Sequence, residues 1–309
     1  MNAPAALIFF NRPDTLKLVF EQVRLAKPER LFLIQDGPRE GRDDDIENIK
    51  KCREIVDEID WQCEVSKNYS EINLGCGMRP QTGITWVLSQ ADRTIILEDD
   101  CVPNQTFFKY CDSLLEKYKD DERIAYISGL NHFEKWDFGG SSYGFTKRGS
   151  IWGWATWARA WKDYDYSVSA INDPYVEACL LKKHPDEKDR IELWKTTNKK
   201  VSAGEKLSYW DVQWGFVKYA QSKLVIVPEY NLIRNIGVGE SSTHFKGGAS
   251  EHKRFTDFND MPTFDLEFPL KEPKAVIIDK DYDETLTKCF KNIKRQAKLK
   301  ALKRKIGLK

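Results

Sequence analysis

The sequence lacks the features of secreted, membrane-spanning and zinc-binding proteins. Its seven cysteines are odd in number, widely spaced and without a C-x-x-C pair, so we expect reduced thiols. No apolar run approaches the roughly 18 residues that a membrane-spanning helix needs. The first residues show neither the basic region nor the small-residue cleavage site of a signal peptide. We therefore expect a cytoplasmic protein.

Several motifs of common enzyme classes are also missing. There is no G-x-x-x-x-G-K-[ST] loop and no G-x-G-x-x-G after an expected strand, which argues against kinases, NTPases and dinucleotide-dependent enzymes. Cysteine and histidine do not show zinc-ligand spacing, and no G-x-S-x-G elbow is present.

Charge is balanced in total but unevenly distributed. The net charge is +1, yet the last 22 residues, from Lys288 to Lys309, contain ten basic residues and no acid. The rest of the chain then holds 39 basic and 48 acidic residues, a net charge of −9. An acidic body argues against a nucleic-acid partner.

The basic segment also has an apolar side. Its apolar residues fall roughly on one side of a helix: Leu286, Phe290, Ile293, Ala297, Leu302 and Ile306. This pattern predicts an amphipathic helix lying on an anionic membrane surface, because apolar side chains enter the interface while Lys and Arg contact the headgroups. The alternative is a solvated terminal helix.

The first half of the chain alternates apolar runs with helical stretches. Strands are expected at residues 5–10, 31–34 and 94–97, with a weaker one at 61–65. Such alternation predicts an α/β fold in which right-handed crossovers build a mainly parallel sheet flanked by helices. We expect one domain over residues 1–250, with a nucleotide-binding half to about 128, an acceptor half beyond it, an extended arm at 251–280 and the basic tail at 281–309.

Polar clusters follow three of the expected strands. They are Asn11-Arg12, Asp36-Gly37 and Glu98-Asp99-Asp100. Ligands on parallel sheets bind at the carboxyl ends of the strands, so the three clusters predict one site. Three consecutive carboxylates need a counter-ion, and Mg²⁺ or Mn²⁺ bound to a diphosphate would supply it. The alternative is a solvated acidic turn before Pro103.

An aromatic segment at residues 150–161 supplies further candidates. Trp154, Trp157 and Trp161 have helical spacing and are expected in the core. Trp152 and Gly153 are better placed to contact a ligand, because glycine admits close approach and indole stacks on sugar rings.

Two more candidates lie near the end of the expected domain. Asp211 stands between Trp210 and Trp214, where a partly dry environment would raise its pKa and suit it to general-base work. The compatible alternative is that it caps a helix. His244, in a loop rich in small residues, could ligate a metal or contact a diphosphate, although a lone loop histidine often does neither.

In their order, these motifs resemble a known family. They are Phe10-Asn11-Arg12-Pro13, Gln35-Asp36-Gly37, Ile96-Leu97-Glu98-Asp99-Asp100, Trp152-Gly153-Trp154 and Trp210-Asp211. Over residues 5–244 the chain resembles glycosyltransferases of the GT-A (Rossmann-like) fold, of the N-acetylglucosaminyltransferase I type and its bacterial family 2-like relatives.

The resemblance implies roles for the donor-binding residues. Asp36 would lie near the uracil ring, and Arg12 would face the donor's nucleotide and diphosphate. Glu98 would contact the sugar, while Asp99 would contact the ribose and a metal-bound water. Arg79 lies in a segment that resembles a donor-binding loop.

It also implies a metal ligand and a base. Asp100 would ligate Mn²⁺, and Asp211 matches the region that supplies the catalytic base. The family pattern has a second acid after that base, where this sequence has Val212.

The expected function is therefore a metal-dependent, inverting transfer of a hexosyl or N-acetylhexosaminyl group from a UDP-sugar to a glycan or lipid-linked acceptor at the inner face of the membrane. One alternative is a sugar nucleotidylyltransferase, although Asn11-Arg12-Pro13-Asp14 does not supply its glycine-rich phosphate loop. The other is a non-catalytic membrane- or glycan-binding protein.

Overall fold

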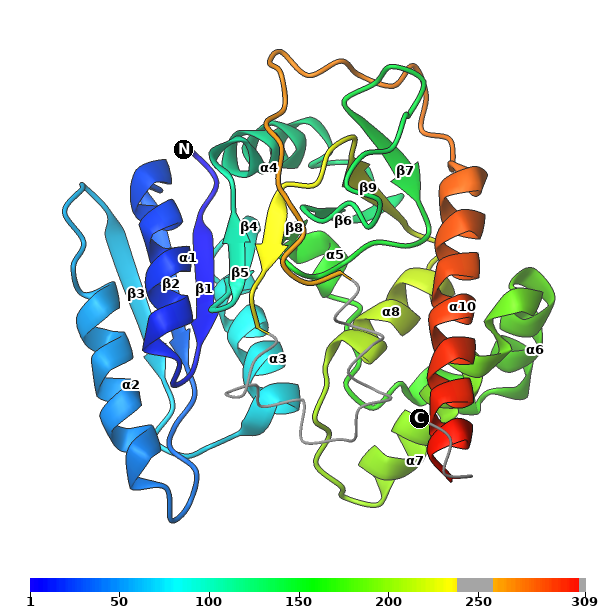
Figure 1. Ribbon diagram of the computed structural model, residues 1–309, viewed down its shortest axis with the longest axis horizontal. Helices are drawn as coiled ribbons and strands as arrows, with labels where there is room; N and C mark the ends of the chain where they lie inside the picture. The colour runs from blue at the N-terminus through cyan, green and yellow to red at the C-terminus, as the bar shows by residue number, and fades with distance from the viewer. Residues whose placement is uncertain (238–257, 306–309) are drawn as a thin grey trace.

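A computed structural model describes residues 1–237 and 258–305 of the chain. Eight strands form its central sheet, in the order β3-β2-β1-β4-β8-β6-β9-β7 (Figure 1). Their bounds in that order are Glu64–Tyr69, Arg30–Gln35, Ala5–Phe9, Arg93–Glu98, Trp154–Trp157, Ile124–Ser128, Leu224–Pro228 and Tyr143–Thr146. Four of the seven pairings in this sheet are parallel. The predicted α/β class, with a mainly parallel sheet flanked by helices, is confirmed.

The winding of the sheet reverses between β1 and β4. Strands β1, β2 and β3 advance towards one edge through the helices α1 (Pro13–Ala26) and α2 (Asp43–Val56), which pack together in front of them (Figure 1). The chain then returns through α3 (Gly75–Leu88) to place β4 on the other side of β1. Because crossovers are right-handed, the reversal puts α3 on the opposite face. The carboxyl ends of β1 and β4 thus flank the position where α/β sheets bind ligands.

The second half of the sheet begins with an antiparallel insertion. Strand β8 lies between β4 and β6 and runs against both, so its first residues lie at the same edge as the last residues of β4. The helix α4 (Gln105–Lys117) leads into β6, and α5 (Ala158–Trp161) continues β8. Trp154, Trp157 and Trp161 are all buried, as predicted.

A smaller helical layer lies below this half of the sheet (Figure 1). It consists of η1 (Ser169–Asn172), α6 (Pro174–Lys183), η2 (Pro185–Glu187), α7 (Lys188–Ser202) and α8 (Asp211–Ala220). Its own apolar cluster contains Trp194, Phe216 and Tyr219. The helix α8 is therefore held in place by apolar packing within this layer.

A second, two-stranded sheet adjoins the end of β4. Strand β5 (Cys101–Pro103) pairs antiparallel with β10 (Ile233–Asn235). The arm at 258–279 then crosses the body without regular helix or strand (Figure 1). It is held by backbone and amide bonds, including Phe264 N to Asn231 O at 2.9 Å.

The C-terminal helix α10 (Lys280–Lys305) is present, as predicted. Its apolar side, however, packs partly on the protein core, whereas contact with a membrane surface was expected. Leu286 and Ile293 are buried in the main core, together with Tyr282. Only near the far end do apolar side chains lie open, with Leu299 and Leu302 at least half exposed. The first half of this side therefore packs on protein rather than lipid. Within the described residues, none of the helices combines the length and the apolar character needed to cross a membrane.

One local expectation was wrong. The weak strand expected at 61–65 forms later, at 64–69, because β3 lies at the sheet edge and is only partly buried, so its side chains carry little apolar pattern.

Candidate functional site

Arg12 and the acidic triplet meet where the winding reverses. Arg12 follows β1 and donates from Nη2 to Asp99 Oδ1 and, at 2.9 Å, to Asp100 Oδ2. The Phe10 N–H donates to the other Asp99 oxygen at 3.2 Å. Burial opposes the charge on the guanidinium, but the ion pairs with Asp99 and Asp100 outweigh it and raise the pKa of Arg12. In this structure, Arg12 is the counter-ion that the triplet requires.

Glu98 differs from its two neighbours because one of its carboxylate oxygens has no hydrogen-bond partner among the described residues. Within the described residues, Glu98 Oε1 is buried and accepts no hydrogen bond. Burial, together with the charges of Asp100 and Asp99, raises the pKa of Glu98 to about 8. Burial also raises the pKa of Asp99, an effect that Arg12 opposes. A buried oxygen without a partner costs free energy unless a ligand satisfies it.

Asp36 lies at the end of β2 and closes the start of α3. Its carboxylate accepts hydrogen bonds from the N–H groups of Gly37, Leu74 and Gly75, at 3.0, 2.9 and 2.8 Å. Burial raises the pKa of Asp36, and the three N–H bonds oppose this. In this structure the carboxylate orders the 36–37 turn and the start of the helix beside it, and the position near the uracil ring that the resemblance implies stays a prediction.

Arg79 does not point freely into the site. It is 5% exposed, and its guanidinium donates to Gln35 O at 3.1 Å and to the backbone and side-chain oxygens of Asn68. Burial lowers the pKa of Arg79. Its bonds join the ends of β2 and β3, and the donor-binding role that the resemblance implies for Arg79 stays a prediction.

Trp152 and Gly153 lie opposite the end of β4. The antiparallel register pairs Trp154 with Ile96, so Gly153 comes beside Leu97. Gly153 has φ +60°, and an added Cβ would lie 2.3 Å from Ile233 Cδ1 and 3.5 Å from Leu97 Cδ2. Glycine thus lets this segment pass close to the triplet. Trp152 is half-buried on the same segment.

Gly153→Ala is expected to lower the free energy of unfolding by about 2–4 kcal/mol, since left-handed backbone and the overlap with Ile233 each add cost. Gly139→Ala is the matched control, because its φ is +67° and nothing lies within 4 Å of its added Cβ. It should lose only about 1–2 kcal/mol. Urea unfolding measures both, and equal losses would show that the contact with Ile233 contributes nothing.

Asp211 is the first residue of α8 and is exposed. The partly dry environment expected for it is therefore wrong: Trp210 and Trp214 are buried, but the carboxylate between them is not. Asp211 nevertheless lies near enough to Glu98 to contribute to its raised pKa. The segment before α8 touches the start of α3, where Cys76 Sγ donates to Ser208 O at 3.1 Å. This contact brings α8 to the edge that carries the triplet.

Asp100 is enclosed by the backbone that leaves β10. The Ile236 N–H donates to Asp100 O at 2.9 Å, and a Cβ added to Gly237 would lie 2.1 Å from Asp100 Oδ2. His244, the second predicted metal ligand, lies outside the described residues. Among the residues placed in the structure, no three Asp, Glu, His or Cys side chains form a group that could hold a metal ion.

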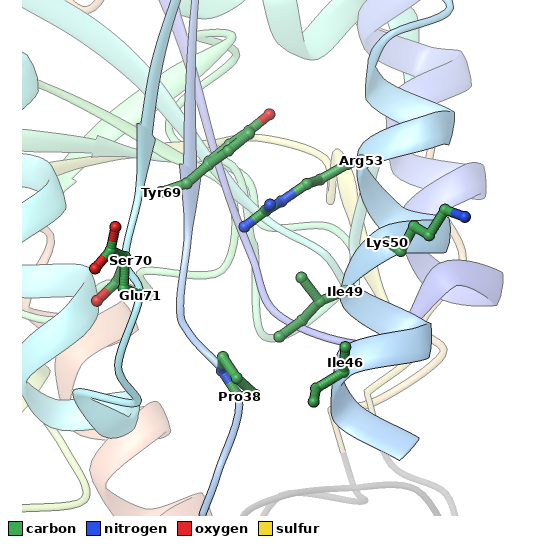
Figure 2. A pocket seen from close by; sticks show the side chains of 8 residues that line it. All are labelled: Pro38, Ile46, Ile49, Lys50, Arg53, Tyr69, Ser70 and Glu71. Atoms are coloured by element: carbon green, nitrogen blue, oxygen red, sulfur yellow. The ribbon is translucent and has the colours of Figure 1, made fainter. Parts of the chain in front are cut away.

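A cavity of about 490 Å³ adjoins the site on the α2 side of the sheet. Figure 2 shows its lining residues between α2 and the ends of β2 and β3: Pro38, Ile46, Ile49, Lys50, Arg53, Tyr69, Ser70 and Glu71. Arg53 lies over the Tyr69 ring and donates from Nε to Gln35 Oε1 at 2.7 Å. The cavity and Asp36 therefore share the turn that follows β2, but the carboxylates of the triplet do not line the cavity.

Two supporting residues escaped the sequence analysis. Gln35 donates from its amide to Phe10 O at 3.0 Å, which joins the ends of β1 and β2, and to Ile49 O at 3.2 Å, which ties β2 to α2. Asp45 is fully buried and accepts from Asn11 at 2.6 Å and from Arg39 at 2.7 Å. Gln35 was within a quoted motif, whereas Asp45 is one of three consecutive aspartates and nothing in the pattern distinguishes it.

The comparisons with known proteins give only distant likenesses. No family model matches the sequence, and no curated protein matches it. The chain is similar in structure to a UDP-glucose pyrophosphorylase complexed with UDP-glucose, at 11% identity and a TM-score of 0.35, over 75% of this chain and 92% of that one. It is also similar to the galactosyltransferase LgtC in complex with donor and acceptor sugar analogs, at 9% identity and a TM-score of 0.41, over 95% of each chain. At these TM-scores the likenesses support no conclusion about function, which has to be sought in the site itself.

Proposed function

We propose that the protein is a glycosyltransferase that moves a sugar from a UDP-sugar to a hydroxyl group of a glycan or lipid-linked acceptor. The observation that supports it most is the meeting of Arg12 with Glu98, Asp99 and Asp100 at the reversal between β1 and β4. Parallel sheets bind nucleotide ligands at this point. The motif order that resembles GT-A glycosyltransferases runs through the same residues.

Each side chain has a role that its geometry allows. Arg12 would turn from the carboxylates to the donor's phosphates, for which its planar fork is suited. Glu98 Oε1, which lacks a partner in the described residues, would bond a sugar hydroxyl. Trp152 would offer its indole to the sugar or the acceptor. Asp211, which is exposed, would take the proton from the acceptor hydroxyl; its oxygen would displace UDP directly from the anomeric carbon, and this single displacement would invert the configuration.

The carboxylate oxygens at Asp100 could hold a divalent cation only if a bound ligand supplied further oxygen ligands to it. Asp100 offers hard carboxylate oxygen, and Mg²⁺ or Mn²⁺ is commonly held by one or two carboxylates together with substrate phosphates and water. The described residues provide no complete protein cage, so the diphosphate would have to complete the coordination. When bound, the cation would neutralise charge on the leaving nucleoside diphosphate.

The acceptor and the location of the protein extend the proposal. The exposed end of α10, with Leu299 and Leu302 among basic residues, would contact an anionic membrane surface. Because Leu286 and Ile293 are buried in the core, the part of the described helix that would make this contact is its last turns.

The test is a panel of nucleotide sugars with Mn²⁺, read by thermal shift and by UDP release in the presence of mixed glycan acceptors. We expect one UDP-sugar to raise the melting temperature, to release UDP with Mn²⁺, and to lose that turnover in EDTA. In the Asp100→Asn variant, adding Mn²⁺ should no longer stimulate UDP release. Pyrophosphate release from UTP and a sugar 1-phosphate would instead identify a nucleotidylyltransferase, and binding without turnover would identify a non-catalytic protein.

A further inference from the structure

One turn of the chain is held by side chains from two different helices. It consists of Lys147 and Arg148, directly after β7. Asp283, on α10, accepts hydrogen bonds from the Lys147 N–H at 2.9 Å and from the Arg148 N–H at 3.1 Å. Lys218, on α8, donates to Lys147 O at 2.5 Å. Three backbone groups of this turn are therefore fixed from outside it.

The side chains that hold the turn are themselves confined. Lys218 is 5% exposed, and its ammonium lies 5.7 and 5.4 Å from the ring centroids of Tyr126 and Tyr219. Arg148 pairs with Glu187, which also accepts from the Tyr219 hydroxyl at 2.9 Å. Burial lowers the pKa of Lys218 to about 7. A buried amine of this kind needs its hydrogen-bond acceptor, so the bond to Lys147 O resists displacement.

The turn leads into the segment that faces the triplet. Only four residues separate Lys147 from Trp152, and Gly153 follows beside the end of β4. The residues between them are held by bonds between hydroxyl and backbone groups: Thr146 Oγ1 to Arg148 O at 2.5 Å, Ser150 N to Ser128 Oγ at 3.2 Å and Trp152 N to Ser150 Oγ at 3.1 Å. The position of this segment therefore depends strongly on the turn at its start.

The Lys147–Arg148 turn is also bonded to α8, through the Lys218 ammonium. Lys218 comes seven residues after Asp211, which is two helical turns and about 10 Å along the axis. Both residues therefore lie on roughly the same side of α8. The turn is a common point of attachment for the segment with Trp152 and for the helix with Asp211.

We propose that Asp283 is a positioning residue: by bonding the Lys147–Arg148 turn, it aligns the Trp152 segment with Asp211, so that α10 is part of the active enzyme rather than a separable tail. The inference rests on the proposed transferase function. Asp283 touches no substrate; it acts through the turn. Because displacements of about 1 Å can cost 10²-fold in rate, losing these bonds should affect turnover more than nucleotide binding.

The experiment compares Asp283→Ala and Asp283→Asn with Asp281→Ala in the full-length protein. Asp281 is the matched control, since it lies in the same first turn of α10 but is exposed. All variants are assayed well below their melting temperatures, with kcat, acceptor and donor KM, UDP affinity, and amide hydrogen exchange of the peptide that covers residues 147–153.

In Asp283→Ala we expect kcat to fall by about 10- to 100-fold, UDP affinity to change less than threefold, and the 147–153 amides to exchange faster. Asp283→Asn keeps one carbonyl acceptor and should recover part of kcat, and Asp281→Ala should behave as wild type. Unchanged kcat, or unchanged exchange, in Asp283→Ala overturns the positioning role. A wild-type protein without any UDP-sugar turnover overturns the proposed function instead, while the exchange data still report whether Asp283 holds the turn.

Discussion

Asp211→Asn is expected to lower kcat by about 10³-fold, because general-base catalysis by a positioned carboxylate typically contributes between 10² and 10⁴. Asparagine keeps the size and polarity of the side chain at the first position of α8 but cannot accept the proton. UDP-sugar affinity should stay within about twofold, because Asp211 lies on the acceptor side of the triplet in our proposal. Steady-state UDP release, combined with calorimetric binding of UDP, measures both quantities.

Glu205→Gln is the control for this change. Glu205 is an exposed acid in the loop that precedes α8, so its replacement removes the same charge without touching the site. We expect its kcat to match that of the wild type. Should Asp211→Asn keep more than a tenth of wild-type kcat, the base must be another group.

The position of the site could be predicted because it depends on strand ends alone. Residues 94–97 form a continuous apolar run, and β4 is buried over Thr94–Leu97. A strand of this kind is expected to be buried on both faces of a sheet, and because β4 runs parallel to β1, the acids that follow it come to the edge where β1 also ends. The same argument placed Arg12 and Asp36 at that edge, since each follows an apolar strand.

The partners of these side chains could not be predicted in the same way. Nothing in the pattern indicates that Arg12 would bind both Asp99 and Asp100, or that Asp36 would take up the N–H groups at the start of α3. Such contacts join residues far apart in the chain. They depend on how close the turns approach one another, which periodicity does not encode.

The tail shows a second limit of pattern-based prediction. An apolar stripe predicts that a helix buries one side, but not what covers it. Leu286 and Ile293 were assigned to lipid, whereas they are buried in the protein core. The buried first part of the stripe is covered by the protein itself, and only the folded structure shows this.

Arg12→Met should produce the largest loss of stability, about 3–5 kcal/mol, because removing one partner of a buried ion pair leaves the other charges uncompensated. The side chains of Asp99 and Asp100 are only 4% and 15% exposed, and Arg12 itself is 17% exposed. Methionine keeps the apolar stem of the arginine, so packing is nearly preserved. The loss in the free energy of unfolding therefore measures the effect of removing the positive charge. Urea unfolding in EDTA measures it.

The matched control is Arg24→Met, which breaks the surface pair between Arg24, on α1, and Asp60, in the loop after α2. Exposed pairs contribute about 0–1 kcal/mol, so this variant should unfold almost as the wild type does. A loss in Arg12→Met no larger than in the control would mean that the Arg12 pairs contribute little to stability.

Metal binding gives Arg12→Met a second readout. With the guanidinium gone, the carboxylates of Asp99 and Asp100 lack their counter-ion, and a cation that binds them should restore stability by mass action. Millimolar Mn²⁺ should therefore raise the melting temperature of Arg12→Met more than that of the wild type, even without nucleotide. Asp100→Asn in the same background should abolish the difference. If Mn²⁺ stabilises neither Arg12→Met nor the wild type with UDP bound, the triplet does not bind a divalent cation, and the negative charge of the donor's diphosphate must be balanced by Arg12 itself.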